Sequence, residues 1–270
     1  MYAGFNLDVS QSDSLSSSIK FSEYLSREND PFADQVKAIQ SKLNEYVLEG
    51  TDIPDGTAIQ DDWFPEMNAD IFISHSHKDV ELAQGLAGWI YKTFGLKCFI
   101  DSNVWGYADH LLEQINSKYS NKREEQSGRV LYDHESCIAA SKHVDTMLTI
   151  ALYKMIDRCE CIFLLNTDNS IQPYGDMPHD KTFSPWIYSE IVCSQLIRKK
   201  ERRNHRKCMD IRHDYASMHE SYTPAYTVTT QHLLPIDISN LIKWENEYQK
   251  KSCEHPLDVL YSQFSEIKLD

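Results

Sequence analysis

The sequence lacks the features that mark membrane-embedded, exported and nucleic-acid-coating proteins. No apolar run approaches the roughly eighteen residues that a membrane-spanning helix requires. The first residues, Met1 to Asn6, contain neither a cationic region nor an apolar core, so we expect no signal peptide. Basic residues are also few, because 27 Lys and Arg stand against 41 Asp and Glu and give a formal net charge of −14. This charge argues against a nucleic acid or an anionic membrane as the main partner.

The sequence also lacks an ordered set of cysteines. Its seven cysteines form neither a disulfide framework nor the two ligand pairs of a structural zinc site. We therefore expect reduced thiols in a cytoplasmic protein, with no metal and no other cofactor. The nearest approaches to a ligand pair are His75 with His77, Cys159 with Cys161, and Cys208 with His213.

The stretch from Asp70 to Asp79 holds the clearest structural signal. Ile71-Phe72-Ile73 is a short run of β-formers without polar alternation, which is typical of a strand buried on both faces in a parallel sheet. The run ends in small polar residues, and Asp79 is placed to cap the helix that follows. A second strand is expected at 97–101, one helix later, and the three elements together predict a right-handed βαβ unit.

The remaining elements predict an α/β fold of the flavodoxin-like type. We expect an open parallel sheet of about five strands with helices on both faces. The third strand is expected at Cys161–Thr167 and the fifth at Leu233–Ile238. The fourth is indistinct, and Ala225–Thr229 is its best candidate.

We expect the chain to consist of two parts, an N-terminal extension and a main domain. Residues 1–68 are interpreted as an N-terminal extension whose first 29 residues look loosely packed. Within it, an amphipathic helix is expected to begin at Asp30-Pro31 and to end before Gly50. Residues 51–68 are interpreted as a linker. Residues 69–270 are interpreted as the main domain, with a polar insertion at about 119–145.

Three segments are expected to meet at the carboxyl edge of this sheet: Ser74-His75-Ser76, the loop from Asp101 to Tyr107, and the start of a helix capped by Ser184. In that helix Trp186 and Glu190 lie four residues apart and share one face. A helix start favours phosphate, so an aromatic ring, a carboxylate and this terminus together suit a dinucleotide. The alternative is a core tryptophan beside a solvated glutamate. His75 either lines the pocket or is an ordinary polar loop residue.

A basic segment departs from the acidic balance of the chain. Residues 198–207 hold seven of the 27 Lys and Arg residues. We interpret them as a solvated helix end whose cations favour the negative end of the dipole, or as a docking patch for an acidic partner or a phosphate.

Three sequence blocks, in this order, resemble a TIR (Toll/interleukin-1 receptor) domain. They are Asp70-Ile71-Phe72-Ile73-Ser74, then Cys98-Phe99-Ile100-Asp101, then Trp186-Ile187-Tyr188-Ser189-Glu190. Leu241-Ile242-Lys243-Trp244 followed by Tyr248 is similar to the last strand and helix of the NAD-cleaving TIR domain of axon degeneration. The resemblance spans roughly residues 69–264 and leaves out the N-terminal segment and the insertion.

The resemblance implies a site and an activity. Glu190 matches the catalytic glutamate of NAD-cleaving TIR domains, and the Trp105 loop matches the BB loop, which gates the pocket and contributes to head-to-tail assembly. The substrate-binding residues would be Ser74, His75, Ser76, Asp101, Trp105 and Trp186. NAD+ would then be a substrate rather than a cofactor, and its cleavage would yield ADP-ribose or a cyclic or conjugated form of it. The pattern is most similar to bacterial TIR proteins of Thoeris-type antiphage defence, which signal to a separate effector protein.

Other interpretations remain open. A TIR adaptor would act through TIR–TIR contacts alone, although adaptors need not keep the glutamate. A nucleoside deoxyribosyltransferase has a related sheet and a catalytic glutamate. A response regulator is set aside, because it needs an aspartate at the end of the third strand, where this chain has Asn166-Thr167.

Overall fold

The computed structural model describes residues 1–9, 19–26, 32, 46–47, 53–106, 108–124, 129–172, 180–206, 215–216, 225–251 and 253–267, with only the backbone of 103–106, 124 and 215–216. The amphipathic helix expected after Asp30-Pro31 lies mostly outside these residues, and near its expected end Val47 instead forms an isolated β-bridge with Pro54.

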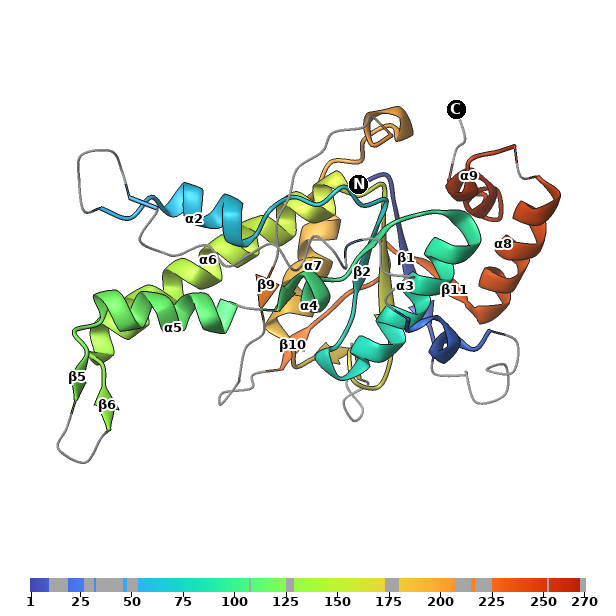
Figure 1. The fold of residues 1–270 in the computed structure, drawn as a ribbon. Helices are drawn as coiled ribbons and strands as arrows, with labels where there is room; N and C mark the ends of the chain where they lie inside the picture. Colours follow the sequence, from blue (N-terminus) through green and yellow to red (C-terminus); the bar gives the residue numbers. More distant parts are fainter. Residues whose placement is uncertain are drawn as a thin grey trace.

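Five parallel strands form one open sheet at the centre of the molecule (Figure 1). Their spatial order is β11 (Leu234–Asp237), β1 (Ala3–Asp8), β7 (Cys161–Asn166), β2 (Ile71–Ser74) and β3 (Cys98–Phe99). Helices cover both faces, so the predicted flavodoxin-like α/β fold is confirmed. Because every strand runs the same way, all five carboxyl ends lie at one edge.

The N-terminal strand takes the place that was expected for the fourth strand. The order β3-β2-β7 follows a flavodoxin sheet, and β1 then fills the gap between β7 and β11. The expected fourth strand at 225–229 is wrong, since β10 (Tyr226–Thr227) pairs antiparallel with β8 (Lys181–Thr182) in a separate small sheet. The expectation of a loosely packed N-terminus is also wrong for residues 3–8, which belong to the main sheet rather than to an extension.

Aromatic packing explains why β1 is central. Phe5 and Leu7 are fully buried. The ring of Phe5 meets Phe163 of β7 edge-to-face, with ring centroids 5.3 Å apart. It also contacts Tyr261 and Phe264 from the C-terminal end of the chain. These rings join the two ends of the chain in one core.

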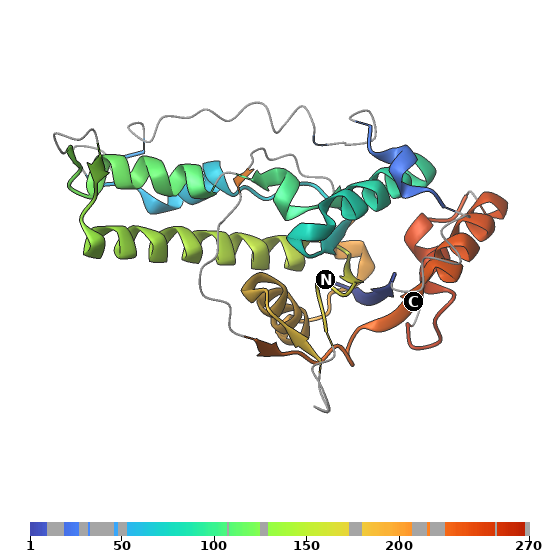
Figure 2. The same ribbon diagram turned by 90° about the horizontal axis from the view of Figure 1, so that it is seen from below.

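Two helical layers sandwich the sheet (Figure 2). Alternate residues of β2 separate the layers, because Phe72 faces one and Ile71 and Ile73 face the other. The first layer contains α2 (Gly56–Trp63), α5 (Ala108–Tyr119), α6 (His134–Arg158) and α7 (Pro185–Leu196). The second contains α3 (Val80–Phe94), α8 (Ile238–Lys250) and α9 (Pro256–Tyr261). The short helix η1 (Phe21–Tyr24) packs in this layer as well.

The segment expected to be a linker is part of the first layer. Asp55 caps α2 by accepting hydrogen bonds from the amides of Thr57 and Ala58. Ile59 and Trp63 of α2 are each only 3% exposed and belong to the same core cluster as α6. The interpretation of residues 51–68 as a linker is therefore wrong.

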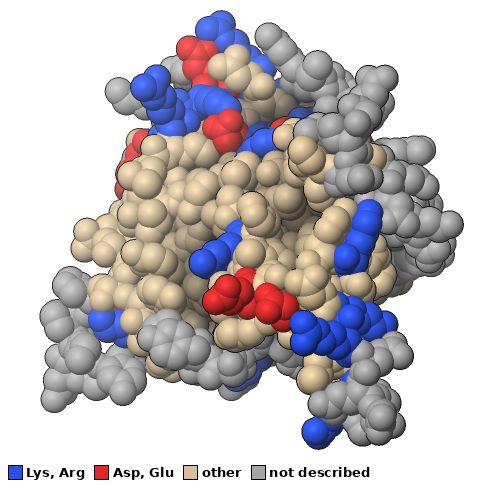
Figure 3. Space-filling view, turned by 90° about the vertical axis from the view of Figure 1, so that its left-hand side faces the viewer, with Lys and Arg blue, Asp and Glu red and all other residues tan. Residues whose placement is uncertain are grey.

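An arm of two packed helices, α5 and α6, extends away from the sheet (Figure 1). A hairpin of β5 (Arg123–Glu124) and β6 (Val130–Leu131) joins them, and α6 begins inside the expected insertion. Although α6 has 25 residues, no helix in the described parts of the chain is long and apolar enough to cross a bilayer. Figure 3 shows the side toward which the arm points, where Lys and Arg lie near the upper and lower edges and two acidic side chains lie beside basic ones just below the centre of a largely uncharged surface. The acidic excess thus does not form one continuous surface there.

Gly85 is required by a close approach of η1 to α3. A Cβ at position 85 would lie 2.6 Å from the carbonyl oxygen of Phe21 and 2.8 Å from its Cβ. We expect Gly85→Ala to displace residues 21–24 and to lower the free energy of unfolding by about 1–3 kcal/mol, despite the better helix propensity of alanine. Chemical denaturation measures this change.

Gly56→Ala is the matched control for that measurement. A Cβ at Gly56 would meet only the flexible end of Met147, at 3.4 Å. A Gly85→Ala protein that matches the Gly56→Ala protein in stability would show that η1 is not held against α3.

Candidate active site

The helix α7 is fixed by its cap and by one apolar face. The side chain of Ser184 accepts a hydrogen bond from the amide of Ile187 at 3.3 Å, and Pro185 takes the first helical position. Both features were predicted from the sequence. Ile187 and Ile191 are buried in the core that α7 shares with α6. This packing sets the direction in which Glu190 points.

Glu190 meets Ser74 at the carboxyl edge of the sheet. Ser74 ends β2 on the same face as Phe72, which is the face that α7 covers. Its hydroxyl donates a hydrogen bond to Oε2 of Glu190, with the two oxygens 2.6 Å apart. Glu190 is 3% exposed and Ser74 is 2% exposed. The glutamate is therefore not the solvated residue of the alternative interpretation.

Burial raises the pKa of Glu190 well above its ordinary value of 4.5, and the neighbouring carboxylate of Asp101 raises it further. The hydrogen bond from Ser74 favours the ionised form and acts in the opposite direction. The carboxyl group thus keeps its proton to a higher pH than an exposed glutamate does. A cation bound beside it would favour release of that proton.

His75 and the polar groups around it lie next to Glu190 and Ser74. The Nε2 atom of His75 is 2.8 Å from the hydroxyl oxygen of Ser102, and its Nδ1 atom is 3.3 Å from the carbonyl oxygen of Ile73. The same Nδ1 lies 3.6 Å from Oδ1 of Asp101. The side chain of His75 is 1% exposed. The structure therefore brings His75 and Asp101 together, as the sequence predicted.

Ser102 was not singled out from the sequence. The only available signal was its place after Asp101, in a segment read as a loop. That segment is instead a helical turn, α4 (Asp101–Val104), followed by β4 (Trp105–Gly106), which pairs in parallel with β9 (Tyr215–Ala216). A helical turn directly after β3 presents Ser102 to His75.

Two of the predicted binding residues have local structural roles. The hydroxyl of Ser76 accepts a weak hydrogen bond, at 3.4 Å, from the amide of Lys78 in the short helix η5 (His77–Asp79). Trp186 is half-buried and packs against the core of the α6 layer, which favours a structural role for its indole. The side chain of Trp105 lies outside the described part of the structure.

Asp79 does not cap α3 with its side chain. Its carboxylate accepts hydrogen bonds from the hydroxyl of Thr167 at 2.6 Å and from the side-chain amide of Asn169 at 2.7 Å. These bonds tie the end of β7 to the start of α3. They hold in place the carboxyl edge between β2 and β7. The chain connections of these two strands lead away in opposite directions there, and open α/β sheets bind ligands at such a point.

The basic segment is used within the chain. Lys200 pairs with Asp157, while Arg202 and Arg206 pair with the acidic side chains of Asp258 and Glu160. The last turn of α7 holds no basic residue, so the interpretation as a helix end is wrong. A docking patch that uses these three cations is not favoured either, because acids of the same chain already bind them.

No group of three or more His, Cys, Asp or Glu side chains is arranged to hold a metal ion among the residues with described positions. Comparisons with protein-family models, with curated proteins and with solved structures find no match to this chain.

Proposed function

We propose that the chain is an enzyme of the TIR type that cleaves the bond between nicotinamide and ribose in NAD+. The observation that carries this proposal is Glu190, a buried carboxyl group of raised pKa that is hydrogen-bonded to Ser74 at the carboxyl edge of the sheet. A buried acid with a perturbed pKa beside a topological switch point is typical of a functional site. The resemblance of the Trp186–Glu190 helix to that of NAD-cleaving TIR domains supports the same assignment.

Cleavage of the nicotinamide–ribose bond needs little from the protein beyond one carboxylate. The nicotinamide ring of NAD+ is already cationic, so it leaves as a neutral base and needs no general acid, unlike the leaving group of ordinary glycosidases. Glu190 would lose its proton as the cationic substrate binds. Its carboxylate would then stabilise the positive charge that develops on the ribose, while Ser74 holds it in place.

The elements around Glu190 would bind the rest of the dinucleotide. The N-terminal amides of α7 favour a phosphate, and Ser76 and the β4 segment lie beyond the same sheet edge. Capture of the ribosyl cation by water would give ADP-ribose, and capture by an internal or external nucleophile would give a cyclic or conjugated product. Such a product would serve as a signal to a separate effector in bacterial antiphage defence, with TIR–TIR self-association controlling the activity.

Incubation of the purified protein with NAD+ tests the proposal. We expect release of nicotinamide and formation of an ADP-ribose product, resolved by mass, with the greatest rate under conditions that promote self-association. Purine deoxynucleosides should not be consumed. Cleavage of deoxynucleosides without cleavage of NAD+ would favour the deoxyribosyltransferase interpretation. An assembled protein that leaves NAD+ intact would favour the adaptor.

A further inference from the structure

We propose that Ser102 and His75 form a proton relay, which removes the proton of the hydroxyl nucleophile that captures the ribosyl cation. This inference rests on the proposed function, because it concerns the second half of the same reaction. No sequence motif indicated Ser102, and the sequence left the role of His75 open.

The tautomer of His75 follows from its neighbours. Its Nδ1 atom faces two oxygens that can only accept, the carbonyl of Ile73 at 3.3 Å and the carboxylate of Asp101 at 3.6 Å. Nδ1 therefore carries the hydrogen of the neutral ring. Nε2 then has a free lone pair, and the hydroxyl of Ser102 at 2.8 Å donates to it. His75 is thus a base that polarises the hydroxyl of Ser102, and the carboxylate of Asp101 lies beside the other ring nitrogen.

The contacts of the imidazole ring assign the order of the relay. Both ring nitrogens of His75 already face protein oxygens, Nε2 that of Ser102 and Nδ1 those of Ile73 and Asp101, so we assign removal of the nucleophile's proton to the serine rather than to the ring. Ser102 is half-buried, whereas the side chain of His75 is 1% exposed. The serine is thus the group that would touch the nucleophile, and His75 is the base behind it.

The relay lies beside the carboxyl group that would stabilise the cation. Ser74 and His75 are consecutive, and the first bonds Glu190 while the second bonds Ser102. Asp101 links the two groups electrostatically, since its carboxylate acts on Glu190 and lies 3.6 Å from His75. Bond cleavage and nucleophile activation therefore share one sheet edge.

Nicotinamide leaves C1′ of the ribose with the bonding electron pair. A water or sugar hydroxyl oxygen then forms the new bond to C1′. Its proton passes to the oxygen of Ser102, and the proton of Ser102 passes to Nε2 of His75. The imidazolium, stabilised by Asp101, later returns one proton to solvent.

Competition between a hydroxyl nucleophile and pyridine tests the relay. The nitrogen of pyridine carries a lone pair and no proton, so exchange of nicotinamide for pyridine does not need a base. We expect Ser102→Ala and His75→Gln to lower the ratio of hydrolysis, or of cyclisation through a ribose hydroxyl, to pyridine exchange by about 100-fold. Ser102→Thr keeps the hydroxyl and should restore most of the wild-type ratio.

This ratio separates a relay from a structural role. Loss of fold or of substrate binding would lower both reactions together, and an unchanged ratio in Ser102→Ala would overturn the relay. A wild-type protein that neither releases nicotinamide nor exchanges it would refute the proposed function itself. A wild-type protein that does both, with variants of unchanged ratio, would refute the relay alone.

Discussion

Glu190→Gln is expected to lower the rate of nicotinamide release by about 10²–10³-fold or more and, at the same time, to stabilise the fold. The amide keeps the size of the side chain and can still accept the hydrogen bond from Ser74. It cannot carry the negative charge that stabilises the ribosyl cation. It also removes an acid that is costly to ionise at a site that is 3% exposed.

The gain in stability should depend on pH with a definite sign. The pKa of Glu190 is raised in the folded protein above its ordinary value of 4.5. Below that value both states are protonated, and the acid costs nothing. As the pH rises toward the folded pKa, the unfolded chain ionises first and the wild type loses stability. Glutamine does not titrate, so the advantage of the variant should grow across this window.

Urea denaturation at a series of pH values measures this difference, and a nicotinamide assay at the same pH values measures activity. The wild-type rate should rise with pH as Glu190 ionises. Glu113→Gln changes an exposed glutamate on α5 and is the matched control for both measurements. A Glu190→Gln protein that cleaves NAD+ at the wild-type rate would remove Glu190 from the mechanism.

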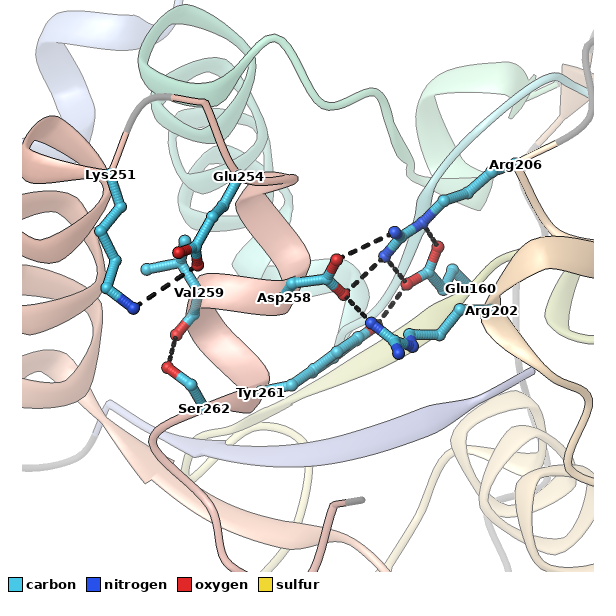
Figure 4. Close-up of polar contacts among 9 residues, drawn as sticks. All are labelled: Glu160, Arg202, Arg206, Lys251, Glu254, Asp258, Val259, Tyr261 and Ser262. Atoms are coloured by element: carbon cyan, nitrogen blue, oxygen red, sulfur yellow. Dashed lines mark hydrogen bonds and ion pairs between the residues drawn. The ribbon is translucent and has the colours of Figure 1, made fainter. Parts of the chain in front are cut away.

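Arg206→Ala is expected to cause the largest loss of stability. Figure 4 shows Arg206 between two acids, with two bonds to Glu160 at 2.7 and 2.8 Å and two to Asp258 at 3.0 and 3.1 Å. Glu160 is only 3% exposed and also accepts a hydrogen bond from the hydroxyl of Tyr261. Removing the guanidinium leaves this buried carboxylate without its cation.

Loss of one partner from a buried ion pair costs about 3–5 kcal/mol, which corresponds for a chain of this size to a fall in melting temperature of roughly 5–10 °C. Arg202 would still bind Asp258, to which it donates a hydrogen bond at 2.6 Å. Burial alone would raise the pKa of Asp258, yet the bonds from Arg206 and Arg202 lower it below 3.8. Asp258 therefore remains ionised at neutral pH.

Arg203→Ala is the control for this prediction. Arg203 lies three residues away, is 79% exposed and pairs only with the exposed Glu201 among the described contacts. Its removal should change the free energy of unfolding by less than about 1 kcal/mol. Equal losses in the two variants would show that Glu160 is solvated and that Arg206 does not stabilise the fold.

The sequence determined the elements whose signals are local. The apolar run at Ile71–Ile73, the helix that ends at Gly95, and the Ser184-Pro185 start of α7 all follow from side chains within a few residues of each other. The positive φ of Gly95, at 71°, is the conformation that glycine adopts most readily at a helix end. Because parallel strands share one carboxyl edge, these signals were also enough to place Ser74 near Glu190.

Only the tertiary structure decided what depends on distant partners. Ala3–Asp8 is short and lies in a Ser- and Asp-rich region, and it becomes a central strand through pairing with β7, more than 150 residues later. Tyr226–Thr227 has a strand composition, but the place in the sheet is already occupied by β1. The contact of Ser102 with His75 depends on a helical turn after β3 that the sequence does not mark. Pairing free energy belongs to two segments together, and no pattern within one of them reveals it.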